Sequence, residues 1–474
     1  MKFIQTQSTV SCGGKGTVWG YLTWNDGSVD ETGFVIEERY MKTGVWSPWT
    51  AIATVGPDVT MYELVLSQTV MEYRVKAVNG SASSPYSNVA NANAVPICES
   101  TSCPAPSALI VSEFRLRGAA GAKDEFVELY NNSASPLTVC TTDNSGGWTL
   151  AARTASGASA APVFTVPNGT VIPARGHYLG VNASPSGGYS LSGHPAGNGT
   201  TATGDITYTS DIEDDSGVAL FKTANPANFT AANRLDAAGF SGAAGTIPDL
   251  YREGTGLSQV GTQNGDYTLY RKMTSASGGT PQDTGNNVSD FSLVATNGGF
   301  YGSLQASLGA PGPENLSSPI QRNSTLGMTN LDTSQGSSAP PNRVRDFTSD
   351  LANNSTFGTL AIRRTVYNNT GGNVTRIRFR VVTLTTWPAP VGVADVRMRT
   401  SGDVQVQVQG VWRTVKGTTL VQPPNQPNGG GYNSAMEMSL PQPLAPGATA
   451  DVQFLLGLQQ TGGFSFLINI EALP

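Results

Sequence analysis

Two short segments of the chain are rich in oxygen ligands. They carry Asp211, Glu213, Asp214 and Asp215 in the first segment, and Asp283 and Asp290 in the second. Because Ca²⁺ takes several oxygen ligands at close range, each segment is a candidate calcium site. The spacing differs from that of an EF-hand loop. Aspartate, asparagine and glycine also form turns, so an ordinary turn is the alternative interpretation of both segments.

A second group of charged residues alternates with apolar ones near the C-terminus. Its members are Arg376, Arg378, Arg380, Arg397 and Arg399. A period of two places side chains on one face of a β-strand. We therefore predict a docking strip for an acidic partner, for example the acidic middle region of a neighbouring molecule. An anionic glycan, DNA or a solvent-facing strand are the alternatives.

The charge of the chain is mildly acidic and unevenly distributed. The net charge is −6, with −3 over residues 1–104, −7 over 105–316 and +4 over 317–474. Duplex DNA binding requires a basic surface, so we expect no nucleic-acid partner. The opposite signs of the last two regions favour self-association or contact with other surface proteins, although solvated faces that merely differ in charge are the alternative.

The sequence offers little for catalysis. The carboxylates of Asp124, Glu125 and Glu128 are close enough in sequence for acid–base chemistry. Strand alternation, however, places Glu128 and Phe126 on one face of the strand and Val127 on the other. The chain has two histidines, and neither accompanies a nucleophile motif. It has no phosphate-binding loop and no G-x-S-x-G elbow. We predict that the protein is not an enzyme.

The cysteines and the termini bear on the compartment. Cys98 and Cys103 are separated by four residues before a proline-rich stretch, and no histidine is near them, so we predict a disulfide rather than a metal site. Disulfides indicate an oxidising compartment. No apolar leader follows Met1, and no run of about 20 apolar residues occurs. We expect an extracellular or cell-surface protein whose start is processed or incomplete.

The elements that must position these residues are β-strands. The chain of 474 residues has 55 glycines, 29 prolines and 13% charged residues, which is typical of turn-rich all-β proteins. Strand-length alternating runs separated by turn residues predict three tandem immunoglobulin-like β-sandwich domains. The predicted boundaries are a domain at 1–95, a Pro/Cys linker at 96–108, a domain at 109–316, a polar linker at 317–342 and a domain at 343–474.

The first domain resembles a known family. The Trp24 strand, "GFVIEERY" (33–40), "YRVKAVNG" (73–80) and "SPYSNVANA" (84–92) resemble a fibronectin type III domain. The chain departs from the family at Met71, where a tyrosine is usual, and in its short opening strand. The resemblance implies a spacer or adhesive module.

The middle domain resembles a second family. The segments "LIVSEF", "DEFVELYNNS", "GWTL", "VIPARGHYLG" and "DDSGVALF" occur in the order of a lamin tail domain, followed by "DTGNNVSDF" and "LGAPGPEN". The resemblance implies an immunoglobulin-like sandwich with long insertions, as found in secreted multi-domain surface proteins. It also implies that His177 and the acids of "DEFVELY" serve the fold. The last domain resembles immunoglobulin-like domains of surface proteins in outline.

Together these features predict a non-enzymatic extracellular structural protein, a subunit of a cell-surface layer or filament. The alternative is an adhesin, or an accessory module of a secreted multi-domain protein that binds a glycan or a protein. Exposed tryptophans would favour the alternative, and the candidates are Trp46, Trp49, Trp148, Trp387 and Trp412. We expect no cofactor other than calcium. The apolar run 464–470 is either a strand that joins a neighbour's sheet or an ordinary core strand.

Overall fold

The computed structural model divides the chain into two compact units, Met1–Ala105 and Pro106–Pro474. It describes residues 2–9, 17–28, 30–42, 45–66, 70–93, 109–153, 160–191, 202–241, 249–273, 278–421 and 425–473. The fold is all-β, as predicted. In the described part of the chain the helices are α1 (Asn287–Asp290) and the 3₁₀ turns η1 (Pro226–Asn228), η2 (Asp249–Tyr251) and η3 (Leu351–Asn353). None of these helices has the length and apolar character needed to cross a membrane.

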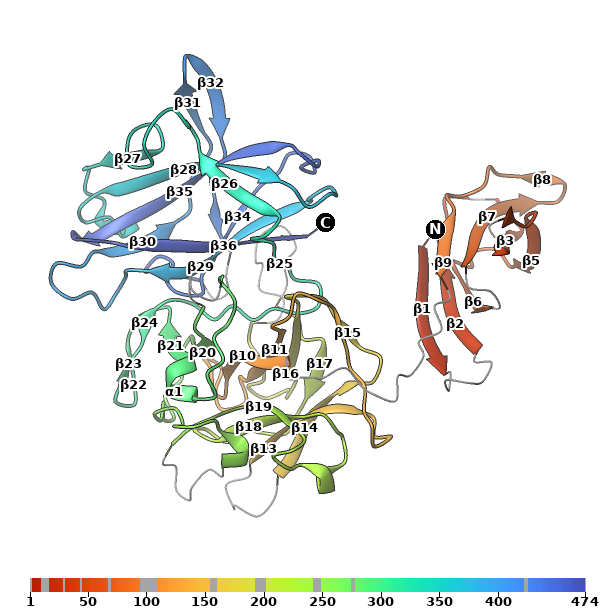
Figure 1. Cartoon of the computed structure of the whole chain (residues 1–474), viewed down its shortest axis with the longest axis horizontal. Coiled ribbons are helices and arrows are strands. Elements are labelled where there is room, and N and C mark those ends of the chain that lie inside the picture. The colour runs from red at the N-terminus through yellow and green to blue at the C-terminus, as the bar shows by residue number, and fades with distance from the viewer. Residues whose placement is uncertain are drawn as a thin grey trace. The chain divides into compact units, whose positions relative to one another are not determined.

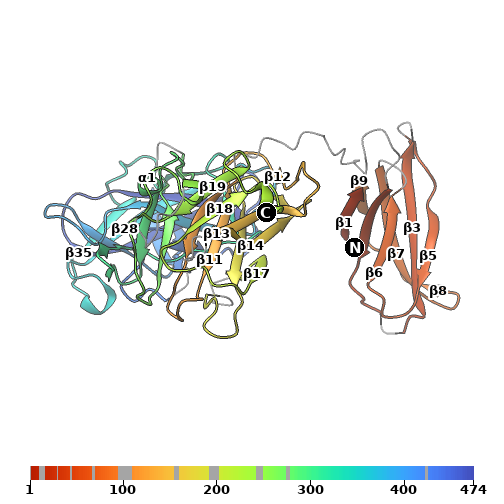
Figure 2. The ribbon, with the colours of Figure 1, turned by 90° about the horizontal axis from the view of Figure 1, so that it is seen from below.

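The first unit has two sheets around a common core. One sheet has the order β1 (Lys2–Thr9), β2 (Thr17–Thr23), β6 (Met61–Leu66). The other contains β3 (Gly33–Lys42), β4 (Val45–Trp46), β5 (Thr50–Val55), β7 (Val70–Asn79), β8 (Ala82–Ser83) and β9 (Ala90–Asn93). Figure 2 shows its long strands side by side. Alternate residues of β3 and β7, such as Ile36 and Tyr73, are fully buried between the sheets.

The opposite face of β3 and β7 carries a ladder of arginines and aromatic rings. The Arg39 guanidinium lies 4.7 Å from the ring centroids of both Trp46 and Trp49. Arg74 lies 4.3 Å from Trp49 and 3.6 Å from Tyr86. These are cation–π contacts, so the two tryptophans and the two arginines support each other on the surface of the sheet.

In the second unit, residues 109–308 form a pair of sheets that we call the middle sandwich. Its larger sheet has the order β17 (Ile206–Tyr208), β16 (His177–Asn182), β11 (Phe126–Asn131), β10 (Leu109–Arg115), β20 (Tyr267–Arg271), β21 (Phe291–Ala295), β24 (Ser307–Leu308). Its smaller sheet has the order β14 (Ala160–Pro167), β13 (Gly147–Arg153), β18 (Gly217–Phe221), β19 (Arg234–Gly239). Two-stranded ribbons pair β12 (Leu137–Thr138) with β15 (Val171–Ile172), and β22 (Phe300–Tyr301) with β23 (Leu304–Gln305). Val127 and Leu129 of β11 face the core between the two large sheets.

Residues 320–473 form a second pair of sheets, the C-terminal sandwich. One sheet has the order β25 (Ile320–Gln321), β36 (Phe466–Leu473), β29 (Arg376–Leu384), β34 (Ala435–Met438), β33 (Thr419–Leu420). The other has the order β26 (Leu326–Asn330), β28 (Thr359–Asn368), β35 (Thr449–Gln460), β30 (Asp395–Arg399), and β27 (Arg343–Asp346) also pairs with β28. β31 (Val404–Val408) and β32 (Val411–Val415) form a hairpin that projects from this sandwich in Figure 1.

One sequence expectation needs correction here, and one pair of alternatives is decided. The segment 317–342 is not a separate linker, because β25 and β26 lie within it and pair with β36 and β28. The strand that includes most of the apolar run 464–470 is not free to join a neighbour's sheet, because β36 lies between β25 and β29. Both pairings join residues far apart in the sequence, so local patterns could not reveal them. The predicted linker at 96–108 lies outside the described residues.

Candidate functional site

β29 presents its arginines on the outer face of the C-terminal sandwich. Ile377, Phe379 and Val381 are buried in the core between the two sheets. The intervening residues Arg378 and Arg380 therefore point to the opposite side, as the period of two predicts. Both are nevertheless buried, with 2% of the residue exposed. The outer face of β29 is thus covered by another part of the chain.

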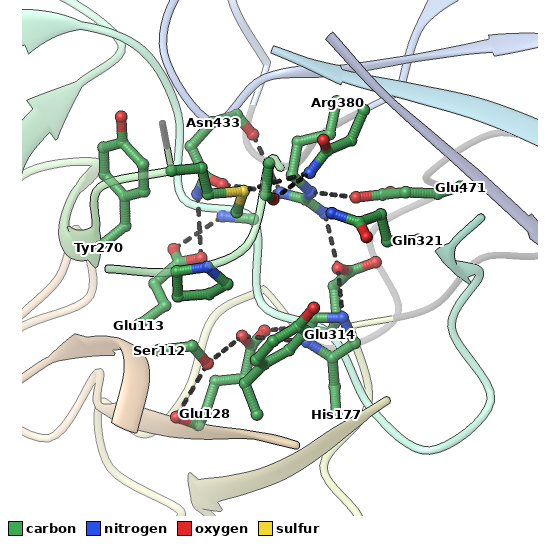
Figure 3. Close-up of a pocket in the computed structure, with 16 residues that line it drawn as sticks. Ser112, Glu113, Glu128, His177, Tyr270, Glu314, Gln321, Arg380, Asn433 and Glu471 are labelled. Carbon is green, nitrogen blue, oxygen red and sulfur yellow. Dashed lines mark hydrogen bonds and ion pairs between the residues drawn. The ribbon is translucent and has the colours of Figure 1, made fainter. Parts of the chain in front are cut away.

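The partners of these two arginines come from both sandwiches. Glu471 is the register neighbour of Arg378 on β36, and its carboxylate lies 2.7 Å from Arg378 and 2.8 Å from Arg380. Glu314 follows the last strand of the middle sandwich, and its carboxylate contacts Arg378 and lies 2.9 Å from Arg380 Nη2. Figure 3 shows Glu314 between the residues of the two sandwiches. The acidic partners of these arginines therefore lie in the same molecule, one on β36 and one in the segment that follows the middle sandwich.

His177 extends the cluster into the middle sandwich. Its Nδ1 lies 3.1 Å from Glu128 Oε1, and its Nε2 lies 3.1 Å from Glu314 Oε2. All three side chains are buried. The ring therefore lies between a carboxylate of the middle sandwich and the carboxylate of Glu314 at the junction.

Glu113 completes the cluster from β10. It is the cross-strand register neighbour of Glu128, so two like charges lie side by side on one sheet. Its carboxylate accepts hydrogen bonds from the Gly312 N–H at 2.8 Å and from Asn433 Nδ2 at 2.9 Å. Burial and the neighbouring Glu128 charge raise the pKa of Glu113. A neutral Glu113 removes the repulsion between the two acids.

These contacts define what we call the charge cluster: Glu113, Glu128, His177, Glu314, Arg378, Arg380 and Glu471. Four carboxyl groups of the cluster thus lie with the two guanidinium groups of Arg378 and Arg380 and the imidazole of His177. Burial would raise the pKa of Glu471, but the charges of Arg380 and Arg378 outweigh it and lower that pKa. Buried charges are tolerated only when paired, so the ion pairs of Arg378 and Arg380 with Glu314 and Glu471 explain how these charges lie in one interface.

The space inside the cluster is small. The cavity that its residues line, together with Tyr270 and Asn433, has a volume of about 20 Å³. That is room for about one water molecule and not for an organic substrate. The ligand atoms of Glu128, His177 and Glu314 lie within 4.8 Å of one another, a spacing that suits a metal ion. The guanidinium groups of Arg378 and Arg380 already neutralise the Glu314 carboxylate. These three side chains therefore form a complete salt-bridge network.

Backbone contacts reinforce the junction around the cluster. The Glu314 N–H donates to Glu128 Oε2 at 2.6 Å, which fixes the chain where it leaves the middle sandwich. Tyr432 of the C-terminal sandwich accepts from the Ala310 N–H at 3.1 Å and donates to the Leu308 carbonyl at 2.9 Å. Asn433 connects both sides, because its Oδ1 accepts from Arg380 Nη1 at 2.7 Å while its Nδ2 binds Glu113. The two sandwiches are therefore joined by side chains and backbone alike.

The other predicted docking arginines also contact carboxylates of this chain. Arg376 lies 3.0 Å from Glu437. Arg397 lies 2.8 Å from Asp395, and Arg399 lies 3.4 Å from Asp350. The expectation of an exposed strip is corrected for the buried Arg378 and Arg380. The three outer arginines are partly exposed and already paired.

The first acidic segment is tied into the middle sandwich. Asp214 lies 2.6 Å from Arg117 Nη2, and Asp215 accepts from the backbone N–H groups of Val260 and Gly261. Asp211 and Glu213 are exposed. The segment thus does not gather its four acids around one point. Calcium binding there stays a prediction.

The second acidic segment surrounds an arginine. Asp283 and Asp290 both lie 3.3 Å from Arg271 Nη1, and Asp236 lies 2.6 Å from Arg271 Nη2. Three carboxylates lie close enough together to bind a cation, those of Asp236, Glu253 and Asp283. The buried Arg271 guanidinium already supplies positive charge to these carboxylates. Calcium at this segment also stays a prediction. Cys98 and Cys103 lie outside the described residues, so their disulfide stays a prediction as well.

The candidate tryptophans fall into different environments. Trp148 is 1% exposed and belongs to the middle core. Trp412, on the projecting hairpin, is 67% exposed, and Trp387 is 43% exposed. Trp46 and Trp49 belong to the arginine ladder of the first unit. Surface aromatic residues therefore exist in both units.

The sequence analysis missed Glu113, Glu314 and Glu471 of the charge cluster, and it did not connect the other four residues with one another. Glu471 alternates with the core residues Ile470 and Ala472, so strand periodicity could have placed it on the same face as Arg378. Glu314 is a lone acid in a glycine- and proline-rich segment, and nothing local connects it to β29. His177 was expected to be structural, and its contacts with two carboxylates assign it a position at the junction.

Comparisons with known proteins give little further guidance. No family model matches the chain, and no curated protein matches it. Among solved structures, the crystal structure of the FN1-FN3 domains of chicken CNTN1 is matched at 8% identity, over 98% of this chain and 97% of that chain. The TM-score is 0.15, which is too low to support an argument about fold or function. The resemblances to fibronectin type III and lamin tail domains therefore stay predictions.

Proposed function

We propose that the protein is a non-enzymatic extracellular structural protein whose second unit acts as a rigid building block of a surface layer or filament. The observation that carries the proposal is the charge cluster. It occupies the interface between two sandwiches, its two arginines are paired with Glu314 and Glu471, and its cavity holds about one water molecule. A catalytic site with the same residue types would need space for a substrate next to the perturbed groups.

A rigid second unit suits a structural role for a physical reason. Breaking the interface would separate Arg378 and Arg380 from Glu314, so the two guanidinium groups would share the single carboxylate of Glu471 in a partly desolvated setting. Bending between the two sandwiches is therefore costly compared with bending at an ordinary polar linker. A subunit that transmits force or defines a repeat distance in an assembly needs this property.

The test is electron microscopy of the native material, together with light scattering of the purified full chain with and without calcium. Regular fibres or sheets in which this chain is the repeating subunit would support the proposal. A chain that stays monomeric in both conditions at high concentration would refute self-assembly as its main role. The calcium arm also tests the two acidic segments, since occupancy would change the assembly or raise the melting temperature.

A second candidate function is adhesion to another surface protein. It is favoured by the projecting hairpin, on which Val411 and Trp412 are 63% and 67% exposed. Exposed aromatic residues are common anchors in protein interfaces. Substitution of Trp412 by alanine should then reduce attachment of the protein to its native surface and leave its melting temperature unchanged.

A further inference from the structure

Three arginines of the C-terminal sandwich share one face of a sheet near its β27 edge, two on β27 itself and one on β28, which there pairs with β26 and β35. Arg343 and Arg345 of β27 are the register neighbours of Ile362 and Leu360 on β28. Arg364 lies two residues beyond Ile362, so the three arginines share one face. Burial, and after it the nearby Arg343 charge, lower the pKa of Arg364, which agrees with this proximity.

These arginines differ from those of β29 in their partners. No Asp or Glu oxygen in the described part of the chain forms an ion pair with Arg343, Arg345 or Arg364, although every arginine of β29 and β30 has such a partner. Arg345 Nη1 donates to the Thr359 carbonyl at 2.8 Å, and Arg364 Nη1 donates to the Arg363 carbonyl at 2.8 Å. The guanidinium groups of Arg345 and Arg364 are therefore held in place by neutral carbonyl groups.

The backbone of the same strand is available for pairing. The Arg363 N–H donates to the Asn342 carbonyl at 2.8 Å, which sets the phase of the antiparallel ladder. In that phase Val344 and Asp346 direct their backbone groups toward β28, and Arg345 directs its own away from it. Among the described strands, β27 pairs with β28 alone. The Arg343 N–H already donates to the Ala339 carbonyl at 3.1 Å, so the backbone groups of Arg345 are the part of the outer edge that can accept another strand.

We propose that this edge binds an extended acidic segment of a partner protein, which adds a strand to β27 and places carboxylates beside Arg343, Arg345 and Arg364. Strand addition supplies backbone hydrogen bonds, and alternate side chains of the added strand meet alternate side chains of β27. Phe347 and Leu351 follow β27 and are 79% and 72% exposed, so an apolar side chain of the partner would also find a contact.

An acidic polypeptide fits the edge better than an anionic glycan. A glycan can neutralise the guanidinium groups, but it cannot continue the hydrogen-bond ladder of β27. The inference goes beyond the proposed function, because a chain that does not self-assemble would still bind such a segment. Failure of one proposal can therefore be distinguished from failure of the other.

The probe is a fluorescein-labelled peptide of five Thr-Glu repeats, titrated with the full chain at low salt and followed by fluorescence anisotropy. The comparison peptides are five Thr-Gln repeats and the Thr-Glu peptide with N-methylated threonines, which lacks alternate backbone donors. Hyaluronate is the competitor that tests the glycan alternative. The triple variant R343Q/R345Q/R364Q is compared with K123Q/K222Q/R252Q, which removes three cations from the middle sandwich.

The proposal predicts at least tenfold weaker binding for the triple variant, for the Thr-Gln peptide and for the N-methylated peptide, and near-unchanged binding for the control variant. Equal binding by wild type and triple variant, with both folded by circular dichroism, would overturn it. Undiminished binding of the N-methylated peptide would overturn strand addition. Displacement by hyaluronate at equal charge concentration would reassign the edge to a glycan.

Discussion

The C-terminal sandwich contains two groups of arginines, one that forms ion pairs with carboxylates and one that forms none with the described residues. On β29, Arg378 and Arg380 are buried and contact Glu314 and Glu471. At the edge formed by β27 and β28, Arg343 and Arg364 have no carboxylate partner among the described residues. Alternation in the sequence is similar in the two regions, so the difference comes from what packs on each face. An internal partner makes arginine structural, and its absence leaves arginine available for an external one.

The largest effect is expected from removing the acid that joins the two sandwiches. Glu314→Ala should lower the free energy of unfolding of the second unit by about 4 kcal/mol, because it leaves Arg378 and Arg380 with an uncompensated share of buried charge. Urea denaturation followed by tryptophan fluorescence measures the change. Glu213→Gln, at an exposed acid of the middle sandwich, is the matched control. A loss below about 1 kcal/mol would contradict a structural role for the cluster.

The next largest effect on stability concerns Glu125, a buried acid that forms no ion pair with the described residues. Burial raises the pKa of Glu125 to about 8, even though hydrogen bonds from Asn182 and from the Ile212 N–H, each at 2.8 Å, act to lower it. The folded state then keeps a proton that the unfolded state loses near its ordinary pKa of 4.5. This contribution is complete below that value and declines as the pH rises toward 8, by about 3 kcal/mol between pH 6 and pH 9.

Glu125→Gln tests this sign directly. The wild-type chain should lose stability from pH 6 to pH 9, and the variant should lose markedly less over the same interval. Denaturant titrations at four pH values provide the comparison. Buried acids such as Glu113 contribute in the same direction, so the variant is expected to be flatter and not flat. Parallel curves for the two proteins would show that Glu125 is ionised in the folded state throughout.

A smaller effect is expected from an ion pair on the surface of the first unit. Arg39 and Glu72 lie 2.5 Å apart with 28% and 14% of their side chains exposed. Solvent screens such a pair, so Glu72→Ala should cost about 0.5 kcal/mol. The change is read from the thermal transition of the first unit at low salt and at 1 M NaCl. A loss comparable to that of Glu314→Ala would mean that exposure does not distinguish the two kinds of pair.

The smallest effect is expected at the free edge. Arg364→Gln removes a half-buried guanidinium that faces Arg343 and has no carboxylate partner in the described structure. We expect the free energy of unfolding to stay constant or to rise by about 0.5 kcal/mol, because repulsion is relieved. Arg378→Gln is the matched comparison and should be strongly destabilising. Equal losses of unfolding free energy in the two variants would contradict the distinction between arginines that stabilise the fold and arginines that are available to a partner.

Much of the fold follows from the sequence, because strand alternation is a local property. The period of two along 376–381 separates Ile377 and Phe379 from the arginines, and the structure has the same arrangement. The pairings of β25 and β26 could not be derived, since their partners lie more than thirty residues away on β28 and at the C-terminus. The functions of Glu314 and His177 depend on which faces meet, and that information is not local to either residue.

The central claim is that the charge cluster makes the middle and C-terminal sandwiches one cooperative body. Differential scanning calorimetry of the full chain at pH 6, for wild type and for Glu314→Ala, tests it most directly. The account predicts one transition for the first unit and a single transition for the second, with the latter shifted down or split in the variant. Three separate transitions in the wild type, or an unchanged profile in the variant, would contradict it.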